Sequence, residues 1–195
     1  MGKNKAVFLD RDGVINEVVY HQEMGLLDSP FTVDQIIVFP RVGDAINQFH
    51  NQGYKVILVS NQPGLAKDHF TMETFEQMNQ KIRDELSKQG ATLDGEYYCL
   101  HHPYGKVKQY TKVCACRKPK PGMLLQASQD HDIDLSQSWM IGDGITDMQA
   151  GAAAGTKTIL IGRMKCDLCR KLDEVQVSPD YIKENLYKAS LIFSE

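Results

Sequence analysis

Short apolar runs recur along this chain, and polar residues follow most of them at once. Continuous apolar runs of this length are typical of strands that a parallel sheet buries on both faces. The expected strands are Lys5–Leu9, Lys55–Val59, Glu96–Cys99, Trp139–Ile141 and Thr158–Ile161.

Segments with a helical spacing of apolar residues separate these runs. Thr71 is expected to cap the longest segment, and Pro121 suits the first turn of another because that turn needs no amide proton. The expected helices span residues 41–52, 71–89, 121–131, 146–154 and, more weakly, 179–191. Strands that alternate with helices predict an α/β fold with a doubly wound parallel sheet. Within the long connection 18–40, Ile36–Phe39 is interpreted as the arm of a hairpin.

The whole chain, residues 1–195, is expected to form a single domain. It carries 22 basic and 25 acidic side chains and has no basic block, which disfavours general binding of nucleic acid. No apolar run approaches the length that crosses a bilayer, and the first residues lack a signal-peptide pattern. These features predict a cytoplasmic protein with neither a nucleic-acid partner nor a membrane partner.

Two carboxylates, Asp10 and Asp12, follow the first expected strand, and Gly13 comes directly after them. Side chains two residues apart in an extended chain point the same way, so both acids would lie on one side of a site. Their repulsion favours a bound cation, and Mg²⁺ prefers hard oxygen ligands and bridges readily to phosphate. The alternative is that both acids are ordinary turn residues.

Three further polar stretches are candidates for the same site. Ser60 follows an expected strand and offers a hydroxyl, with loop amides behind it, to a phosphoryl group. Asp143 follows another strand and is placed to complete a metal site, whereas Asp147 would complement the dipole of the helix that it opens. Lys118 precedes a proline that restricts its backbone. Ligands of open α/β sheets bind at the carboxyl ends of the strands, which favours one shared site.

This chain resembles the haloacid dehalogenase (HAD) superfamily of phosphohydrolases over about residues 5–165. The four sequence motifs of that superfamily match, in order, Asp10-Arg11-Asp12-Gly13-Val14, Ser60, Lys118 and Gly142-Asp143 with Asp147. The resemblance implies a Rossmann-like core and covalent catalysis, in which Asp10 is the nucleophile that forms an aspartyl phosphate.

The resemblance also implies the roles of the other motif residues. Asp12 would protonate the leaving oxygen and then deprotonate the attacking water. Ser60 and Lys118 would hold the transferring phosphoryl group. Mg²⁺ would be bound by the side chains of Asp10 and Asp143 and by the backbone carbonyl of Asp12.

Cysteine and histidine pairs delimit a loop over residues 99–116. A Cys-x-His pair and a Cys-x-Cys pair supply the four ligands that close the tetrahedral shell of a structural zinc ion. The candidate ligands are Cys99, His101, Cys114 and Cys116. His102 is an alternative to His101, and free buried cysteines are the alternative to a metal site. Because Arg117 and Lys118 follow directly, zinc here would fix the direction in which both cations leave the loop.

With this loop and the stretch Cys-Arg-Lys-Pro-Lys-Pro-Gly-Met at 116–123, the chain resembles the D,D-heptose 1,7-bisphosphate 7-phosphatase family. The related histidinol-phosphate phosphatases have a tighter zinc loop. The resemblance implies magnesium-dependent hydrolysis of the 7-phosphate, in the synthesis of nucleotide-activated heptose for lipopolysaccharide or another surface polysaccharide. A histidinol-phosphate phosphatase, or a phosphatase of another small ester, is the alternative within the class. A non-catalytic zinc-binding module is the alternative outside it.

Members of this group lack a large cap domain, and the stretch between Asp12 and Ser60 is too short for a cap that folds by itself. Loops are therefore expected to select a small sugar phosphate, and a monomer is expected because no cap buries an interface. The expected substrate contacts are Arg11, Val18, Val19, Tyr20, His21, Asn61, Gln62, Pro63, Arg117 and Gly144. Gly144 and Pro63 depart from the family pattern of lysine and serine, which removes one cation and one hydroxyl and favours a different anomer or another small ester.

Cys166 and Cys169 lie outside the resemblance. A Cys-x-x-Cys pair can bind a metal or act as a redox couple. Since no second pair remains to complete a zinc shell, two reduced cysteines are the favoured interpretation.

Overall fold

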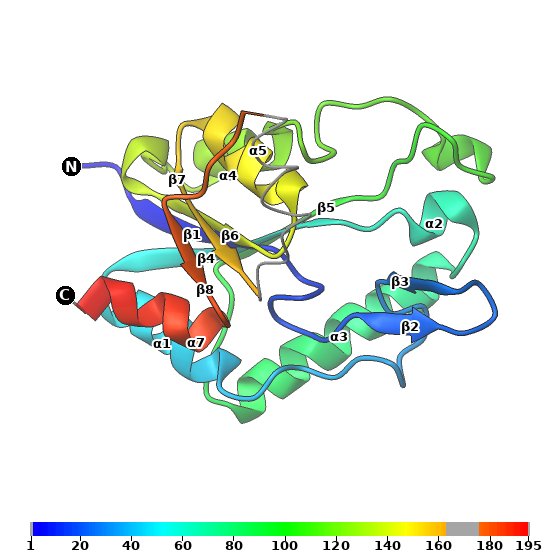
Figure 1. Ribbon diagram of the computed structural model, residues 1–195, viewed down its shortest axis with the longest axis horizontal. Helices are drawn as coiled ribbons and strands as arrows, with labels where there is room; N and C mark the ends of the chain where they lie inside the picture. Colours follow the sequence, from blue (N-terminus) through cyan, green and yellow to red (C-terminus); the bar gives the residue numbers. More distant parts are fainter. Residues whose placement is uncertain (1, 163–175, 195) are drawn as a thin grey trace.

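Six parallel strands form one sheet in the computed structural model, which describes residues 2–162 and 176–194. The order is β5-β4-β1-β6-β7-β8 (Figure 1). After β1 the chain builds outwards through β4 to β5 and then crosses to the other side of β1, which confirms the doubly wound arrangement. The strands are β1 (Lys5–Leu9), β4 (Tyr54–Asn61), β5 (Gly95–Cys99), β6 (Trp139–Gly142), β7 (Lys157–Ile161) and β8 (Tyr181–Lys183).

Helices cover both faces of this sheet. Successive side chains of a strand point to opposite faces, so Val7 and Leu9 join one buried cluster while Ala6 and Phe8 join the other. The first cluster is completed by α1 (Val42–Asn51), α3 (Met72–Lys88) and α7 (Leu186–Ser190), and the second by α4 (Gly122–Asp130) and α5 (Ile145–Ala154). The remaining short turns are α2 (Gly64–Lys67), η1 (Lys108–Tyr110), η2 (Leu135–Gln137) and η3 (Leu191–Ser194).

The helix starts follow the capping residues that the sequence contains. The Oγ1 of Thr71 accepts a hydrogen bond from the amide of Thr74 at 3.2 Å, so Thr71 caps α3 as predicted. Pro121 stands directly before α4. None of the described helices combines the length and the hydropathy that a membrane span requires.

Two expectations about the connecting segments are wrong. The hairpin consists of β2 (Val19–His21) and β3 (Leu26–Asp28), whereas within Ile36–Phe39 only Val38 forms a bridge, to Asn16. Residues 179–191 contain the edge strand β8 before α7 instead of one helix. An edge strand leaves side chains in solvent, and the exposed Tyr181 and Ile182 give no buried-strand pattern. Cys166 and Cys169 lie outside the described residues.

No separate cap domain interrupts the chain between Asp12 and Ser60. The described elements there are the β2–β3 hairpin, α1 and β4. Figure 1 shows the hairpin beyond the carboxyl end of β1. Any selection of a ligand at this end of the sheet must therefore come from the hairpin and the loops.

Close packing of α5 on the sheet leaves no room for a side chain at Gly151. A Cβ there would lie 2.7 Å from the Cβ of Met140 and 2.8 Å from the Cγ2 of Thr158. We expect Gly151→Val to lower the free energy of unfolding by about 1–3 kcal/mol, the usual cost of overpacking. Ala152→Val, on the exposed side of the same helix, should cost only about 0.7 kcal/mol of helix propensity. Urea titrations measure both, and equal losses would contradict the packing argument.

Candidate active site and metal centre

Adjacent strands deliver the candidate catalytic residues to one edge of the sheet. Asp10 follows β1, Ser60 lies near the end of β4, and Asp143 follows β6. Oxygen atoms of Asp10, Asp143 and Asp147 lie within 4.8 Å of one another. The structure thus brings the residues of the first and fourth motifs together, as the sequence pattern predicts.

The ammonium group of Lys118 is buried between two of these carboxylates. Its Nζ lies 2.9 Å from Oδ1 of Asp10 and 2.6 Å from Oδ1 of Asp147, and it donates to the Val59 carbonyl at 2.8 Å. Burial by itself would lower the pKa of Lys118, but the carboxylates of Asp10 and Asp147 outweigh it and raise this pKa. Lys118 therefore stays protonated beside the expected nucleophile.

Negative charge remains in excess around this ammonium. Desolvation, followed by repulsion from Asp147, raises the pKa of Asp10 to about 6. Asp143 keeps contact with solvent, yet the protein crowded around its carboxylate, together with Asp10 and Asp147, raises its pKa to about 7. Three carboxylates around one lysine ammonium fit a hard divalent cation such as Mg²⁺, because its charge would offset their repulsion.

Two glycines allow the acids to come this close. Gly13 has a φ of +82°, and a Cβ on it would collide with the carboxylate of Asp143. A Cβ on Gly142 would collide with the side chain of Asp147. The loops after β1 and β6 can therefore lie against each other only while these positions lack side chains.

The second acid of the first motif, Asp12, is held by donors from three residues. Its carboxylate accepts from Nε and Nη2 of Arg11 at 3.1 and 3.2 Å, from Nε2 of Gln62 at 2.6 Å, and from Nδ2 of Asn16 at 2.8 Å. Arg11 and Gln62 are both completely buried. Their polar groups face Asp12 and the protein interior, and their expected contact with substrate stays a prediction.

Polar side chains at the end of β4 and in the loop after it form hydrogen bonds within the protein, chiefly to Lys118 and Asp12. The amide group of Asn61 bonds the backbone of Lys118 in both directions, each at 3.0 Å. Ser60 is buried and its Oγ accepts from Nε2 of Gln62 at 3.1 Å. Pro63 is buried at the start of α2. Asn61 therefore holds the backbone of Lys118, and its expected contact with substrate stays a prediction.

The hairpin residues expected at the substrate divide into inner and outer positions. His21 is buried, stacks on Phe31 with ring centroids 3.7 Å apart, and places Nε2 2.9 Å from the Ser29 carbonyl. Its ring therefore packs on the segment that follows β3, and its expected contact with substrate stays a prediction. Tyr20 is 61% exposed, and Val18 lines a cavity of about 650 Å³ that reaches Asp143. The hairpin position of Val19 is half-buried.

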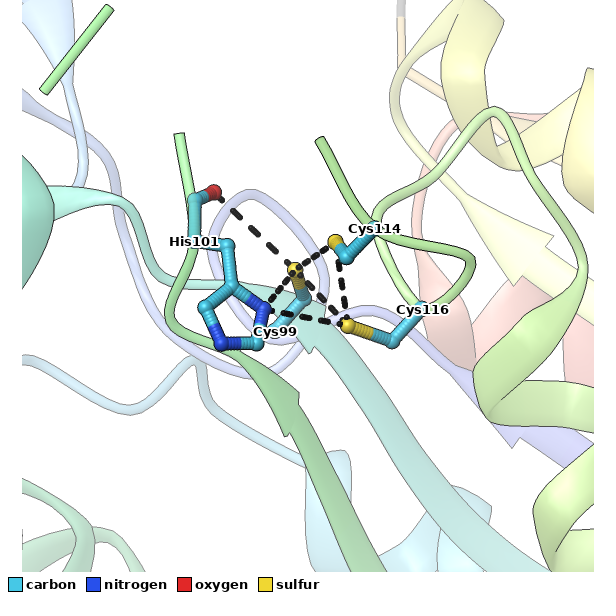
Figure 2. A group of neighbouring side chains, drawn as sticks. All are labelled: Cys99, His101, Cys114 and Cys116. Carbon is cyan, nitrogen blue, oxygen red and sulfur yellow. Dashed lines mark hydrogen bonds between the residues drawn. The ribbon is translucent and has the colours of Figure 1, made fainter. Parts of the chain in front are cut away.

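Three thiols and one imidazole form a compact cluster in the loop over residues 99–116 (Figure 2). The sulfur atoms of Cys99, Cys114 and Cys116 lie 3.2–3.5 Å from one another. The Nδ1 of His101 points to them, 3.4 Å from the sulfur of Cys116. His102 is not in the cluster, and its Nδ1 accepts from the Tyr104 amide instead.

The donor chemistry of this cluster fits a metal ion. Burial raises the pKa of the Cys99 thiol, so a thiolate there needs a cation nearby. Burial also lowers the pKa of His101, which leaves the neutral imidazole that metals bind. The cluster could hold a metal such as zinc, and the expected choice of His101 over His102 agrees with the geometry.

The loop over residues 99–116 leads directly to the edge of the sheet that carries Asp10. Cys116 precedes Arg117, whose Nη1 donates to the His101 carbonyl at 3.4 Å. The next residue, Lys118, reaches Asp10. The amide of Gly144 donates to Oδ2 of Asp147 at 3.0 Å, so this backbone group holds Lys118's second partner.

Sequence reasoning missed the pairing of Asp147 with Lys118. The spacing carried a signal, since Asp147 lies one helical turn after Asp143 and turns back towards the start of α5. Asn16 was also missed. Its Nδ2 bonds Asp12, but nothing in the local sequence distinguishes it from an ordinary turn residue.

Comparison with known proteins now defines the family. A model described as HAD-hydrolase-like matches residues 115–189. A D-glycero-beta-D-manno-heptose-1,7-bisphosphate 7-phosphatase from Yersinia pestis is 42% identical over 157 residues, which cover 80% of this chain and 79% of that protein. The phosphatase of the same name from Photorhabdus laumondii is 43% identical over the same shares of both chains. This chain belongs to the family of heptose bisphosphate phosphatases.

The fold of this heptose bisphosphate phosphatase family member agrees with a solved relative. The D,D-heptose 1.7-bisphosphate phosphatase from B. bronchiseptica, complexed with magnesium and phosphate, superposes with a TM-score of 0.78. The two are 28% identical, and the match covers 97% of this chain and 98% of that one. Because the match extends over nearly the whole length of both chains, this chain has the same fold as that phosphatase.

We expect Gly13→Ala to lower the magnesium-dependent rate of phosphate release about 100-fold or more, because the new methyl group displaces Asp143. Gly25→Ala is the matched control, since Gly25 also has a positive φ, +62°, but has open space around it. Both variants carry a similar backbone strain, of order 1 kcal/mol. Calorimetric titration with Mg²⁺ and phosphate release measure the difference. Equal losses in both variants would attribute the effect to strain alone.

Proposed function

We propose that this chain is a magnesium-dependent phosphatase that removes the 7-phosphate of D-glycero-β-D-manno-heptose 1,7-bisphosphate. The observation that carries the proposal is the buried contact of Lys118 with Asp10, beside Asp143, in a chain about 42% identical to phosphatases named for that substrate. A carboxylate nucleophile next to a fixed ammonium is suited to attack on an anionic phosphate ester.

The first step makes a covalent intermediate. A carboxylate oxygen of Asp10 attacks phosphorus, the bond from phosphorus to the sugar oxygen breaks, and Asp12 gives its proton to that oxygen. Lys118 and Ser60 hold the oxygens of the phosphoryl group as charge redistributes. Mg²⁺, bound by the side chains of Asp10 and Asp143 and the Asp12 carbonyl, would supply charge that offsets the repulsion between nucleophile and substrate.

The second step regenerates the enzyme. A water attacks the phosphorus of the aspartyl phosphate and gives a proton to Asp12, and the bond from phosphorus to the Asp10 oxygen breaks. Inorganic phosphate leaves, and Asp12 is protonated again for the next turnover. The donors from Arg11, Gln62 and Asn16 hold the Asp12 carboxylate in one orientation. A fixed orientation suits a group that gives a proton to the sugar oxygen and later takes one from water.

Selection of the sugar falls to partly or fully exposed side chains around this edge of the sheet. Val18 and Tyr20 lie just before and within the strand β2, and Arg117 directly follows the loop over residues 99–116. Gly144 has no side chain to contact a second phosphate of the substrate. Arg117, directly before Lys118, is therefore the cation proposed for that contact. The relatives' names favour the β anomer of the heptose.

The cluster of three thiolates and one imidazole is proposed to hold zinc. Four protein ligands close the tetrahedral shell, which marks a structural ion with no open position for a substrate. The ion would fix the loop over residues 99–116 and thereby the direction of Arg117 and Lys118.

The proposed biological setting follows from this substrate. The product would feed the synthesis of nucleotide-activated heptose for lipopolysaccharide or another surface polysaccharide. The partner is a small sugar phosphate, with no nucleic acid and no membrane, and the enzyme would act as a cytoplasmic monomer. The near balance of 22 basic and 25 acidic side chains supports the absence of a polyanionic partner.

Phosphate release from a small panel tests the substrate. With Mg²⁺ present, we expect the β anomer of D-glycero-D-manno-heptose 1,7-bisphosphate to exceed histidinol phosphate by about 100-fold or more in kcat/KM. Asp10→Asn keeps the shape of the side chain and removes the nucleophile, so it should release no phosphate above background. Preference for histidinol phosphate would replace this substrate, and a folded wild type without any turnover would favour the non-catalytic module.

Metal analysis tests the zinc centre. Cys114→Ser should lose the zinc that the wild type retains and lower kcat, because Lys118 is no longer aimed by a fixed loop. Val113→Ser is the control, since it is the preceding residue, is 75% exposed and offers no thiolate. Elemental analysis and phosphate release are measured on both. Full activity of a zinc-free Cys114→Ser protein would contradict the positioning role of the metal.

A further inference from the structure

The guanidinium of Arg11 lies out of solvent among partners from different parts of the chain. Nε and Nη2 face the Asp12 carboxylate, and Nη2 also donates to Oε1 of Gln62 at 2.7 Å. The other terminal nitrogen, Nη1, donates to Oδ1 of Asn79 at 2.9 Å. A buried guanidinium is costly unless its donors are matched, so these acceptors determine where it lies.

Asn79 comes from α3, 68 positions further along the chain than Arg11. It is 2% exposed and belongs to the buried face of a helix that otherwise buries Phe75, Met78 and Ile82. An amide in such an apolar row is unfavourable unless it is hydrogen-bonded. The bond to Arg11 satisfies Asn79 and connects a core helix to the loop that carries Asp12.

We propose that Asn79 is a positioning residue for the proton transfers of Asp12 and acts through Arg11. The guanidinium is planar and rigid, so an acceptor that fixes Nη1 also fixes the opposite edge, formed by Nε and Nη2. That edge faces the Asp12 carboxylate. The inference rests on the proposed function, because it assigns a supporting residue to the acid and base of that mechanism.

The two steps of the reaction respond differently to a misplaced Asp12. A sugar oxygen leaves as a strong base unless Asp12 protonates it, whereas 4-nitrophenolate is a weak base and leaves without a proton. Both substrates form the same aspartyl phosphate, and its hydrolysis needs Asp12 to take a proton from water. A misplaced Asp12 therefore slows both steps with a sugar phosphate but only the second step with 4-nitrophenyl phosphate.

Three variants of α3 test this inference. Asn79→Leu keeps the size of the side chain and removes the acceptor, Asn79→Asp keeps an acceptor oxygen for Arg11, and Ile82→Val trims the same buried face without touching Arg11. With the heptose bisphosphate, we expect Asn79→Leu to lower kcat by about 10–100-fold, and Asn79→Asp and Ile82→Val to stay within about 3-fold of wild type. With 4-nitrophenyl phosphate, Asn79→Leu should release its first equivalent of nitrophenol at the wild-type rate and then slow down, a burst that neither the wild type nor Ile82→Val shows.

Several results would overturn the inference. Equal losses of Asn79→Leu on both substrates without a burst would indicate a merely structural role, as would the same burst in Ile82→Val. An Asn79→Asp protein as slow as Asn79→Leu would show that the acceptor oxygen is not what matters. A wild type that hydrolyses 4-nitrophenyl phosphate but not the heptose bisphosphate would refute the proposed substrate alone, because the burst comparison still decides the role of Asn79. A wild type that hydrolyses neither would overturn both.

Discussion

The ammonium of Lys118 lies 2.9 Å from Asp10 and 2.6 Å from Asp147, and only 1% of its side chain is exposed. A charge so completely removed from water is stable only beside opposite charges with good geometry, and the loss of one partner leaves an uncompensated buried ion. The end of β1, the Val59 carbonyl of β4 and the start of α5 must therefore converge on a single nitrogen atom, which the segment after Cys116 supplies. Catalytic geometry and fold stability depend on the same contact, so changes at either carboxylate affect both.

Lys118 reaches these partners from a segment that follows the loop over residues 99–116 and forms no helix or strand. The residue lies two positions after Cys116, and its backbone is bonded on both sides by the amide of Asn61. The cluster of Cys99, His101, Cys114 and Cys116 lies at one end of the segment, and Asn61 holds the other from the end of β4. A lysine side chain loses considerable rotamer entropy when it is immobilised. Because hydrogen bonds already hold the backbone of Lys118, fixing its ammonium costs less additional conformational entropy.

The sequence predicted those features that local pattern controls. The apolar runs of β1, β4 and β6 are buried on both faces, so each strand and the acid or hydroxyl at its end could be located without coordinates. The members of the Cys/His cluster could be chosen because Cys-x-His and Cys-x-Cys pairs carry their own spacing. The strand β8 could not be located from the sequence, because its side chains lie in solvent at the edge of the sheet. The interior position of Arg11 was also out of reach, because one of its acceptors, Asn79, lies 68 residues away and an arginine in a loop is ordinarily exposed.

Asp10 and Asp12 have identical side chains, and their environments give them different tasks. Asp10 faces an ammonium, a compact charge on a single nitrogen, and two further carboxylates, so that its pKa rises to about 6 even with Lys118 in contact. A divalent cation beside this carboxylate would lower its pKa again and keep it ionised over a wider pH range. Asp12 faces a planar guanidinium and two side-chain amides that fix the direction of its oxygens. Two buried cations, Lys118 beside Asp10 and Arg11 beside Asp12, thus give these carboxylates different surroundings within three consecutive residues, as the proposed division between nucleophile and proton carrier requires.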